Sequence, residues 1–234
     1  MRNFAPIAFG LSLLAGALIW AALAPAQNDK SNNGTTTWSV KVTNLTAAPD
    51  GQPLSPPVWA VHNDKFVMWR TGQQATNGAA LIMEDAIAMP LAGLMAKNKQ
   101  QIFGSKVELP PETDPPTPPP ILPGNQSRTF TVQTTKGYDR LSILTMLVRT
   151  NDAFTGLDSL KVKAGTFNVN AYDAGTEKNN EVGSFIPGPP FGHMFVRDQD
   201  AQLIAPHPGL RQDGELAAYI WQDPVARIEI KRLP

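Results

Sequence analysis

The sequence predicts an all-β fold, an antiparallel sandwich with short helices in one connection, from three observations. The 234 residues include 22 prolines, and only 17% of the residues are charged, which is unusual for a helical protein. Several segments alternate apolar and polar side chains with the period of two that is typical of half-buried strands. Turns rich in proline, glycine and asparagine separate these segments, and such residues end strands and fix turns.

Six segments carry the predicted strands. The first, residues 37–43, alternates over seven positions. The second begins at Val58, directly after prolines that could not pair inside a ladder. In the last, Ala226, Ile228 and Ile230 face one way and the charged residues the other. The expected strands are residues 37–43, 58–62, 127–134, 141–148, 167–172 and 225–231.

One helical region is expected, over residues 77–98, which are rich in alanine, leucine, methionine and isoleucine. Pro90 divides this region, because proline lacks the backbone N–H and clashes with the preceding turn. We therefore expect two short helices that cover one end of the sandwich. The methionines of this region are interpreted as core filler rather than as ligands: Met83, Met89 and Met95.

The proline-rich stretch 108–124, ELPPETDPPTPPPILPG, excludes both a helix and an inner strand. It is predicted to be an extended, polyproline-like surface loop between strands. A ligand for a proline-binding partner domain is the alternative. It is not interpreted as a domain boundary, because the strands before it are too few to form an independent sheet.

The N-terminus predicts a signal peptide. An apolar run over residues 4–23 is followed by Ala24-Pro25-Ala26, so residues 1–26 are expected to be cleaved before Gln27. The run is close to the ~20 residues that span a bilayer, and an uncleaved anchor is therefore the alternative. Residues 27–35 are predicted to be a flexible lead-in. The mature chain is expected to be secreted, periplasmic or at the cell surface, with no membrane span.

Composition excludes several classes of function. Lysine plus arginine equals aspartate plus glutamate at 20 each, so no basic excess favours nucleic acid as a partner. The absence of cysteine excludes thiol catalysis, zinc–thiolate sites and disulfides. The three histidines, His62, His193 and His207, are too scattered for a zinc-binding helix, and the nucleophile elbow of lipases is missing. The sequence is therefore not expected to be an enzyme.

Carboxylates follow two of the predicted strands. The apolar strand ends in Thr150-Asn151-Asp152, and the next alternating strand ends in Asp173-Ala174-Gly175-Thr176-Glu177. Calcium takes six to eight oxygen ligands in irregular geometry, and Gly175 lets the second loop fold tightly. Asp152, Asp173 and Glu177 could thus hold one ion. Spacing alone nevertheless favours ordinary turn chemistry over a metal site.

Several short motifs of the sequence occur together in one family. Residues 44–62 contain N-L-T, then G-Q-P-L-S-P-P, then a strand that ends in histidine. The chain ends in the strand V-A-R-I-E-I, and the second acidic loop is D-A-G-T-E. In these respects the sequence resembles the spondin N-terminal domain, in the form of a stand-alone secreted bacterial protein. The resemblance covers about residues 36–232, the predicted domain.

The resemblance implies a C2-like sandwich that binds calcium. The family's ligands are an aspartate in the loop before a Gly-Leu pair and two acids of a D-A-G-T-[DE] motif. By this resemblance they correspond to Asp152, Asp173 and Glu177, with glutamate where the animal proteins have the shorter aspartate.

The function that the resemblance implies is a binding or adhesion module at the cell surface or matrix, with an unknown extracellular protein or glycan as partner. The alternative is a carbohydrate- or lipid-surface binding module in which calcium bridges to the ligand. A remote alternative is a hydrolase with Asp173 and Glu177 as its acid pair. Partners of the animal proteins are not transferred, because those proteins carry cysteines and thrombospondin repeats that this chain lacks.

Overall fold

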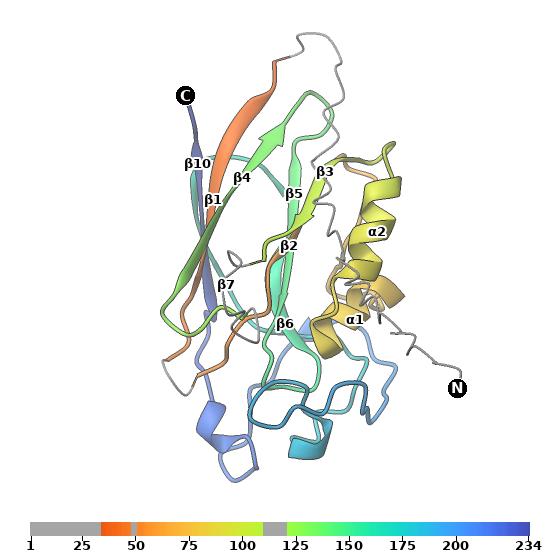
Figure 1. Ribbon diagram of the computed structural model, residues 1–234, viewed down its shortest axis with the longest axis vertical. Coiled ribbons are helices and arrows are strands. Elements are labelled where there is room, and N and C mark those ends of the chain that lie inside the picture. The colour runs from red at the N-terminus through yellow and green to blue at the C-terminus, as the bar shows by residue number, and fades with distance from the viewer. Residues whose placement is uncertain (1–33, 48–50, 110–120) are drawn as a thin grey trace, which may run out of the picture. The chain divides into compact units, whose positions relative to one another are not determined.

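The computed structural model describes residues 34–47, 51–109 and 121–234, which form an antiparallel β-sandwich with two short helices against one sheet (Figure 1). The predicted all-β class, with helices in one connection, is confirmed. The predicted signal peptide 1–26, most of the lead-in and residues 110–120 of the proline-rich loop lie outside the described residues. No helix in the described part of the chain is long and apolar enough to cross a membrane.

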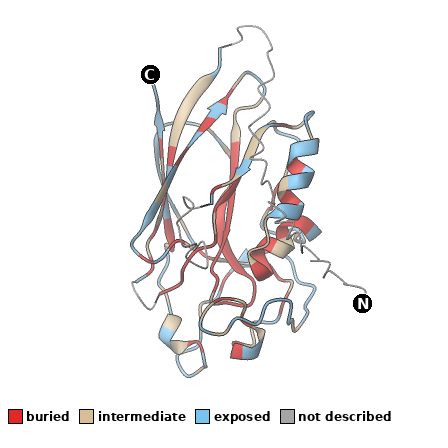
Figure 2. Ribbon diagram, in the orientation of Figure 1, coloured by how far each residue is buried: buried red, intermediate tan, exposed pale blue. Residues whose placement is uncertain are grey.

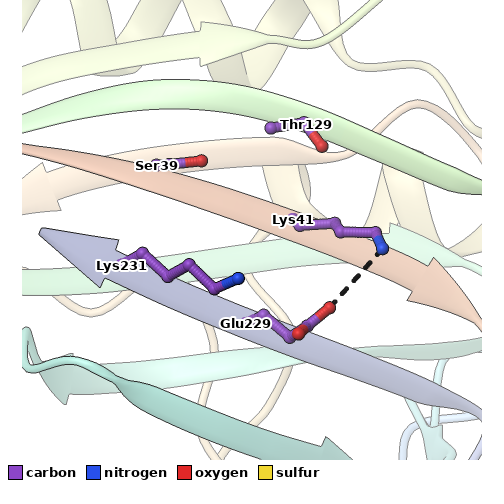
Figure 3. A pocket seen from close by; sticks show the side chains of 5 residues that line it. All are labelled: Ser39, Lys41, Thr129, Glu229 and Lys231. Carbon is purple, nitrogen blue, oxygen red and sulfur yellow. Dashed lines mark ion pairs between the residues drawn. The ribbon is translucent and has the colours of Figure 1, made fainter. Parts of the chain in front are cut away.

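The first sheet has four strands in the order β4-β1-β10-β7. Its inward side chains, such as Val40 and Val42, are fully buried between the two sheets, while the intervening Lys41 is exposed. The outer face is polar and holds a hollow of about 120 Å³ around the Lys41–Glu229 ion pair (Figure 3). The strands are β4 (Ser127–Thr134), β1 (Thr36–Asn44), β10 (Ala226–Arg232) and β7 (Gly165–Val169).

The second sheet has six strands in the order β3-β2-β5-β6-β8-β9. Its middle strands are buried on both faces, and Figure 2 shows the buried residues concentrated there. This explains why 141–148 is a mostly apolar run rather than an alternating one. The strands are β3 (Ile102–Val107), β2 (Val58–His62), β5 (Arg140–Met146), β6 (Ala153–Lys161), β8 (Tyr172–Asp173) and β9 (Ala205–Pro206).

The helices α1 (Asn77–Asp85) and α2 (Met89–Lys97) cover the outer face of the six-stranded sheet. The expectation that they cover one end of the sandwich was therefore wrong. Apolar residues on that face of β2 and β5 require a cover, and helix residues fill it: Ile82, Met83, Leu91 and Met95 pack with Val58, Ala60, Leu144 and Phe154.

Pro90 lies in the first turn of α2, where a missing N–H costs no helical bond. Met89 is 68% exposed and is not core filler.

The chain changes sheets inside the predicted strand 167–172. Phe167 belongs to β7 of the first sheet, and Tyr172 belongs to β8 of the second. Ala171, at the crossing, donates its N–H to Asp223 Oδ1 at 2.9 Å. One predicted strand is thus two short strands, and the second of them, β8, pairs with β6.

Candidate functional site

The three predicted carboxylates lie at one end of the sandwich. Asp152 immediately precedes β6, and Asp173 ends β8, the neighbour of β6; the register pairs Ala153 with Asp173. Glu177 follows in the loop after β8, and its N–H donates to Asp152 Oδ2 at 2.9 Å. The fold therefore brings two distant acidic turns of the sequence into contact.

The first turn is closed by its own side chain. Thr150 Oγ1 donates to the carbonyl oxygen of Leu147 at 2.6 Å and accepts from the N–H of Ala153 at 3.0 Å. The Leu147 N–H reaches the Ala153 carbonyl oxygen at 2.8 Å. These bonds hold Asp152 fully buried at the base of the turn.

The second loop wraps around one oxygen of Asp152. Asp152 Oδ2 accepts the N–H of Thr176 at 2.8 Å and the Thr176 hydroxyl at 3.1 Å, besides the N–H of Glu177. Gly175 has φ = +70°, and a Cβ there would lie 2.7 Å from the Gln202 carbonyl oxygen. Only glycine fits this position without displacing the neighbouring backbone.

The remaining oxygens of the two acids are buried without a partner. Asp152 Oδ1 and Glu177 Oε2 make no hydrogen bond to any described residue. Burial raises the pKa of Asp152 to about 7, and the nearby charge of Asp173 adds to the effect. Burial likewise raises the pKa of Glu177 to about 8, with the charge of Asp152 as the next cause. Asp152 forms no ion pair with any described residue, and for Glu177 the effect of burial outweighs that of the one cation nearby, Arg197.

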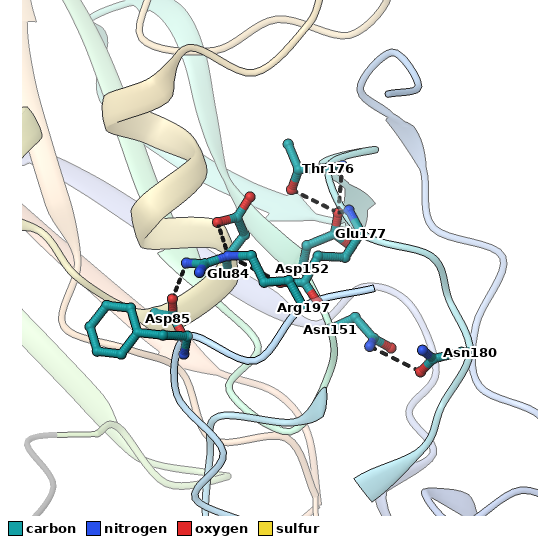
Figure 4. Close-up of polar contacts among 9 residues, drawn as sticks. Glu84, Asp85, Asn151, Asp152, Thr176, Glu177, Asn180 and Arg197 are labelled. Carbon is teal, nitrogen blue, oxygen red and sulfur yellow. Dashed lines mark hydrogen bonds and ion pairs between the residues drawn. The ribbon is translucent and has the colours of Figure 1, made fainter. Parts of the chain in front are cut away.

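The nearest cation is Arg197, which is shared among three carboxylates (Figure 4). Its Nε lies 2.6 Å from Glu84 Oε2 and 3.6 Å from Glu177 Oε1, and its Nη2 bonds to Asp85 Oδ2. Glu84 and Asp85, the last two residues of α1, are both buried although charged side chains usually face solvent. None of these three residues was predicted for the site from the sequence, because no local pattern links residue 197 to helix α1.

Asp173 is engaged differently from the other two acids. Its Oδ1 accepts the N–H of Gly175 at 2.6 Å, and its Oδ2 accepts from the side chain of Asn179. Within the described residues, no three His, Cys, Asp or Glu side chains are already arranged to hold a metal ion. The donor set thus fits calcium in part: two buried oxygens are free, and the third carboxylate would have to leave Asn179.

His62 is packed inside the fold, with Nδ1 donating to the Asn63 carbonyl oxygen at 2.7 Å and Nε2 at 2.9 Å from Ser142 Oγ. Trp59 and Trp69 are buried in the core, and Trp221 is half-buried.

Comparison with known families identifies the fold. The family model described as Spondin_N matches residues 36–184, more than half of the chain, and both acidic loops lie inside the match. No curated protein matches the chain. The matched family is of an extracellular type and is not a known family of enzymes. The chain therefore belongs to the spondin N-terminal domain family.

Proposed function

We propose that this chain is a secreted domain that binds calcium at the loop end of its sandwich, through Asp152, Asp173 and Glu177. Its role is that of a binding or adhesion module outside the cell, with a protein or glycan as partner, rather than that of an enzyme. The observation that carries the calcium proposal is the pair of buried carboxylate oxygens, Asp152 Oδ1 and Glu177 Oε2, that have no partner among the described residues.

The charge balance of the site supports a cation. Four buried carboxylates lie around Arg197 and its neighbours: Glu84, Asp85, Asp152 and Glu177. A buried ionised carboxylate without a partner is strongly destabilising, so the cluster must either take up protons or bind positive charge. Calcium prefers oxygen ligands and tolerates irregular geometry, and backbone carbonyls and water can complete its six to eight ligands.

The surrounding residues hold the two free oxygens in place. Three donors from Thr176 and Glu177 orient Asp152 through its Oδ2, which leaves Oδ1 for an ion. Arg197 lies near Oε1 of Glu177, which leaves Oε2. A bound calcium ion would tie the β5–β6 turn to the loop after β8, and it would stabilise both.

The hydrolase alternative is less well supported. Glu177 meets one requirement of a catalytic acid, because it is buried and its pKa is raised. Its supposed partner, Asp173, has both carboxylate oxygens engaged by Gly175 and Asn179. Asp173 would have to release one of these partners to act on a substrate, as it would to bind calcium, and the two free oxygens belong to Asp152 and Glu177 instead.

Thermal unfolding of the full chain tests the proposal, with calcium, magnesium or EDTA at fixed ionic strength and pH 7.5. A ligand that binds only the folded state stabilises it by about 2.7 kcal/mol at a hundredfold excess over its dissociation constant. We expect calcium, and not magnesium, to raise the melting temperature by several degrees. An unchanged melting temperature in calcium would refute the site.

A variant separates the ion from general electrostatics. Asp152→Asn keeps an oxygen acceptor for Thr176 and Glu177 but removes the buried charge. It should be insensitive to calcium and should melt above the native protein in EDTA. Asp213→Asn, at an exposed acid of the same loop region, is the matched control and should keep the full calcium response. A calcium response that survives in Asp152→Asn removes this residue from the site.

A further inference from the structure

Lysines gather in the turns at the other end of the sandwich. The strands β3, β2, β5 and β6 are neighbours in one sheet, and each has its turn at this end. We call the six lysines in these four turns or directly beside them the lysine row: Lys97 (the last residue of α2) and Lys99 before β3, Lys65 after β2, Lys136 before β5, and Lys161 (the last residue of β6) and Lys163 after it. Neighbouring strands lie about 4.8 Å apart, so the row extends over about 14 Å.

Hydrogen bonds hold three of the turns to one another. Asn63, after β2, donates its N–H to the Gln101 carbonyl oxygen at 2.9 Å and its side-chain N–H to that of Gln100 at 3.1 Å. Tyr138, before β5, donates its hydroxyl to the same Gln100 oxygen at 3.0 Å. In the fourth turn, the N–H of Val162 bonds to the Asp139 carbonyl oxygen at 2.8 Å. The row is therefore a defined surface rather than a set of independent loops.

The lysine row is exposed and poorly neutralised. All six lysines are exposed, and the same turns carry two acids, Asp64 and Asp139. Asp139 lies 3.6 Å from Lys161, and the other five lysines form no ion pair with any described residue. A chain of zero net charge thus concentrates positive charge on one surface, which creates a local field that attracts anions.

The surroundings of the row suit sugars as well as anions. A hollow of about 330 Å³ is lined by residues 160–163 at one end of the row. Phe103, 40% exposed, lies beside Tyr138 with ring centroids 6.0 Å apart, and this pair offers an apolar face to a sugar ring. The exposed Gln100 side chain stands next to Lys99 and can both donate to and accept from hydroxyl groups.

We propose that the lysine row binds an acidic polysaccharide, which it recognises by its carboxylate or sulfate groups. Lysine ammonium groups act as separate point charges, and their spacing along a line matches a linear polymer with charges at intervals. Among the described residues the four turns themselves expose no large apolar side chain, and Phe103, beside them in β3, is only 40% exposed, so little of this surface would enter a lipid bilayer. The extracellular type of the family places such polymers, rather than nucleic acid, within reach. This surface lies away from the proposed calcium site and needs no calcium.

Binding of two probes to the full chain tests the proposal: polygalacturonate, which carries carboxylates, and dextran sulfate, which carries sulfates. Neutral dextran is the control polymer, and EDTA excludes bridging by a cation. Calorimetry at 50 mM NaCl should detect binding of at least one acidic polymer and none of neutral dextran. Raising the salt to 200 mM should weaken binding, because lysines release the counterions of a polyanion.

Two variants with the same net charge locate the surface. Lys65→Gln/Lys99→Gln/Lys136→Gln/Lys163→Gln removes four charges from the row, and binding should weaken at least tenfold. Lys41→Gln/Lys106→Gln/Lys178→Gln/Lys231→Gln removes four charges elsewhere, including the two lysines in Figure 3, and should change the affinity by less than twofold. If the row variant melts early, its two halves, Lys65→Gln/Lys99→Gln and Lys136→Gln/Lys163→Gln, should each show a partial loss.

Three results overturn the proposal. The first is that the native chain binds neither acidic polymer at 50 mM salt. The second is an equal loss of affinity in the row variant and the control variant, which would mean that only net charge matters. The third is binding to vesicles of anionic phospholipid without binding to either polymer, which would assign the row to a membrane.

Discussion

The two ends of the sandwich differ in the sign of their charge and in its burial: one end has buried acids, and the other has exposed lysines. At the loop end, Asp85, Asp152 and Glu177 are at least 95% buried. Asp85 and Glu177 share Arg197, whereas Asp152 forms no ion pair with any described residue. At the turn end, the lysine row stands in solvent, and among the described residues only Lys161 has an acidic partner. The net charge of zero hides this separation. From residue 173 to residue 223 alone, eight acids face three basic residues.

The comparison indicates that buried charges affect folding stability, whereas exposed charges affect binding. A buried charge is linked to folding, because removing its partner leaves an uncompensated ion in a medium of low polarity. An exposed charge contributes little to stability, because water and salt screen it. Changes at the loop end should therefore alter the free energy of unfolding, whereas changes at the turn end should alter binding alone.

The largest effect is expected from Arg197→Met. Its side chain is 18% exposed and contacts Glu84, Asp85 and Glu177, so its loss leaves three buried acids without their cation. Breaking a buried pair on one side costs about 3–5 kcal/mol. Urea unfolding of the variant in EDTA at pH 7.5 measures the loss.

Arg211→Met is the matched control for that experiment. Its side chain is 60% exposed and lies 3.5 Å from Glu181. Glu181 is buried, but both of its oxygens keep the backbone N–H of Arg211 as a partner after the change. The expected loss is below about 1 kcal/mol. Equal losses in the two variants would contradict the distinction between buried and exposed charge.

A smaller but still large effect is expected from pH. The pKa values of Asp152 and Glu177 are raised in the folded chain to about 7 and about 8, above those of the unfolded chain. The folded state therefore binds more protons than the unfolded state, and stability falls as pH rises from about 5 to about 8. In EDTA this fall should amount to several kcal/mol. Saturating calcium should reduce it, because the ion replaces the protons.

Urea unfolding at pH 5 and pH 8 measures this slope, and Asp152→Asn is the control. The variant should lose less stability with rising pH than the native chain, because one of the two titrating groups is gone. A native chain that becomes more stable toward pH 8 in EDTA would contradict the description of these acids as buried and unpartnered.

The parts of the fold with one buried face could be predicted from the sequence. Residues 37–43, 127–134 and 225–231 alternate, and each is a strand of the four-stranded sheet. The strand β6 was not predicted, because it is buried on both faces in its first half and includes the polar Thr155 and a glycine. At that glycine, Gly156, a Cβ would lie 1.9 Å from the Ile143 carbonyl oxygen. Its residue type is set by a neighbouring strand, which local sequence does not show.

The candidate site, too, was predicted only in part. Asp152, Asp173 and Glu177 lie at or near the ends of strands, so their place at one end of the sandwich could be expected. Glu84, Asp85 and Arg197 could not, because a helix and a loop more than 100 residues apart meet only in the folded chain. The lysine row was not predicted for a similar reason: its lysines lie at four turns that become neighbours only through the strand order.

The smallest effect is expected at the turn end, from Lys161→Gln. This lysine has the one acidic partner in the row, Asp139 at 3.6 Å, but the two side chains are 76% and 47% exposed. An exposed pair contributes less than about 1 kcal/mol, so we expect urea unfolding to show a change of at most about 0.5 kcal/mol. Calcium should stabilise the variant as much as the native chain, because the ion binds at the other end. If the loss of unfolding free energy were comparable to that of Arg197→Met, the charges at the turn end would also contribute strongly to stability. The contrast between the two ends would then fail.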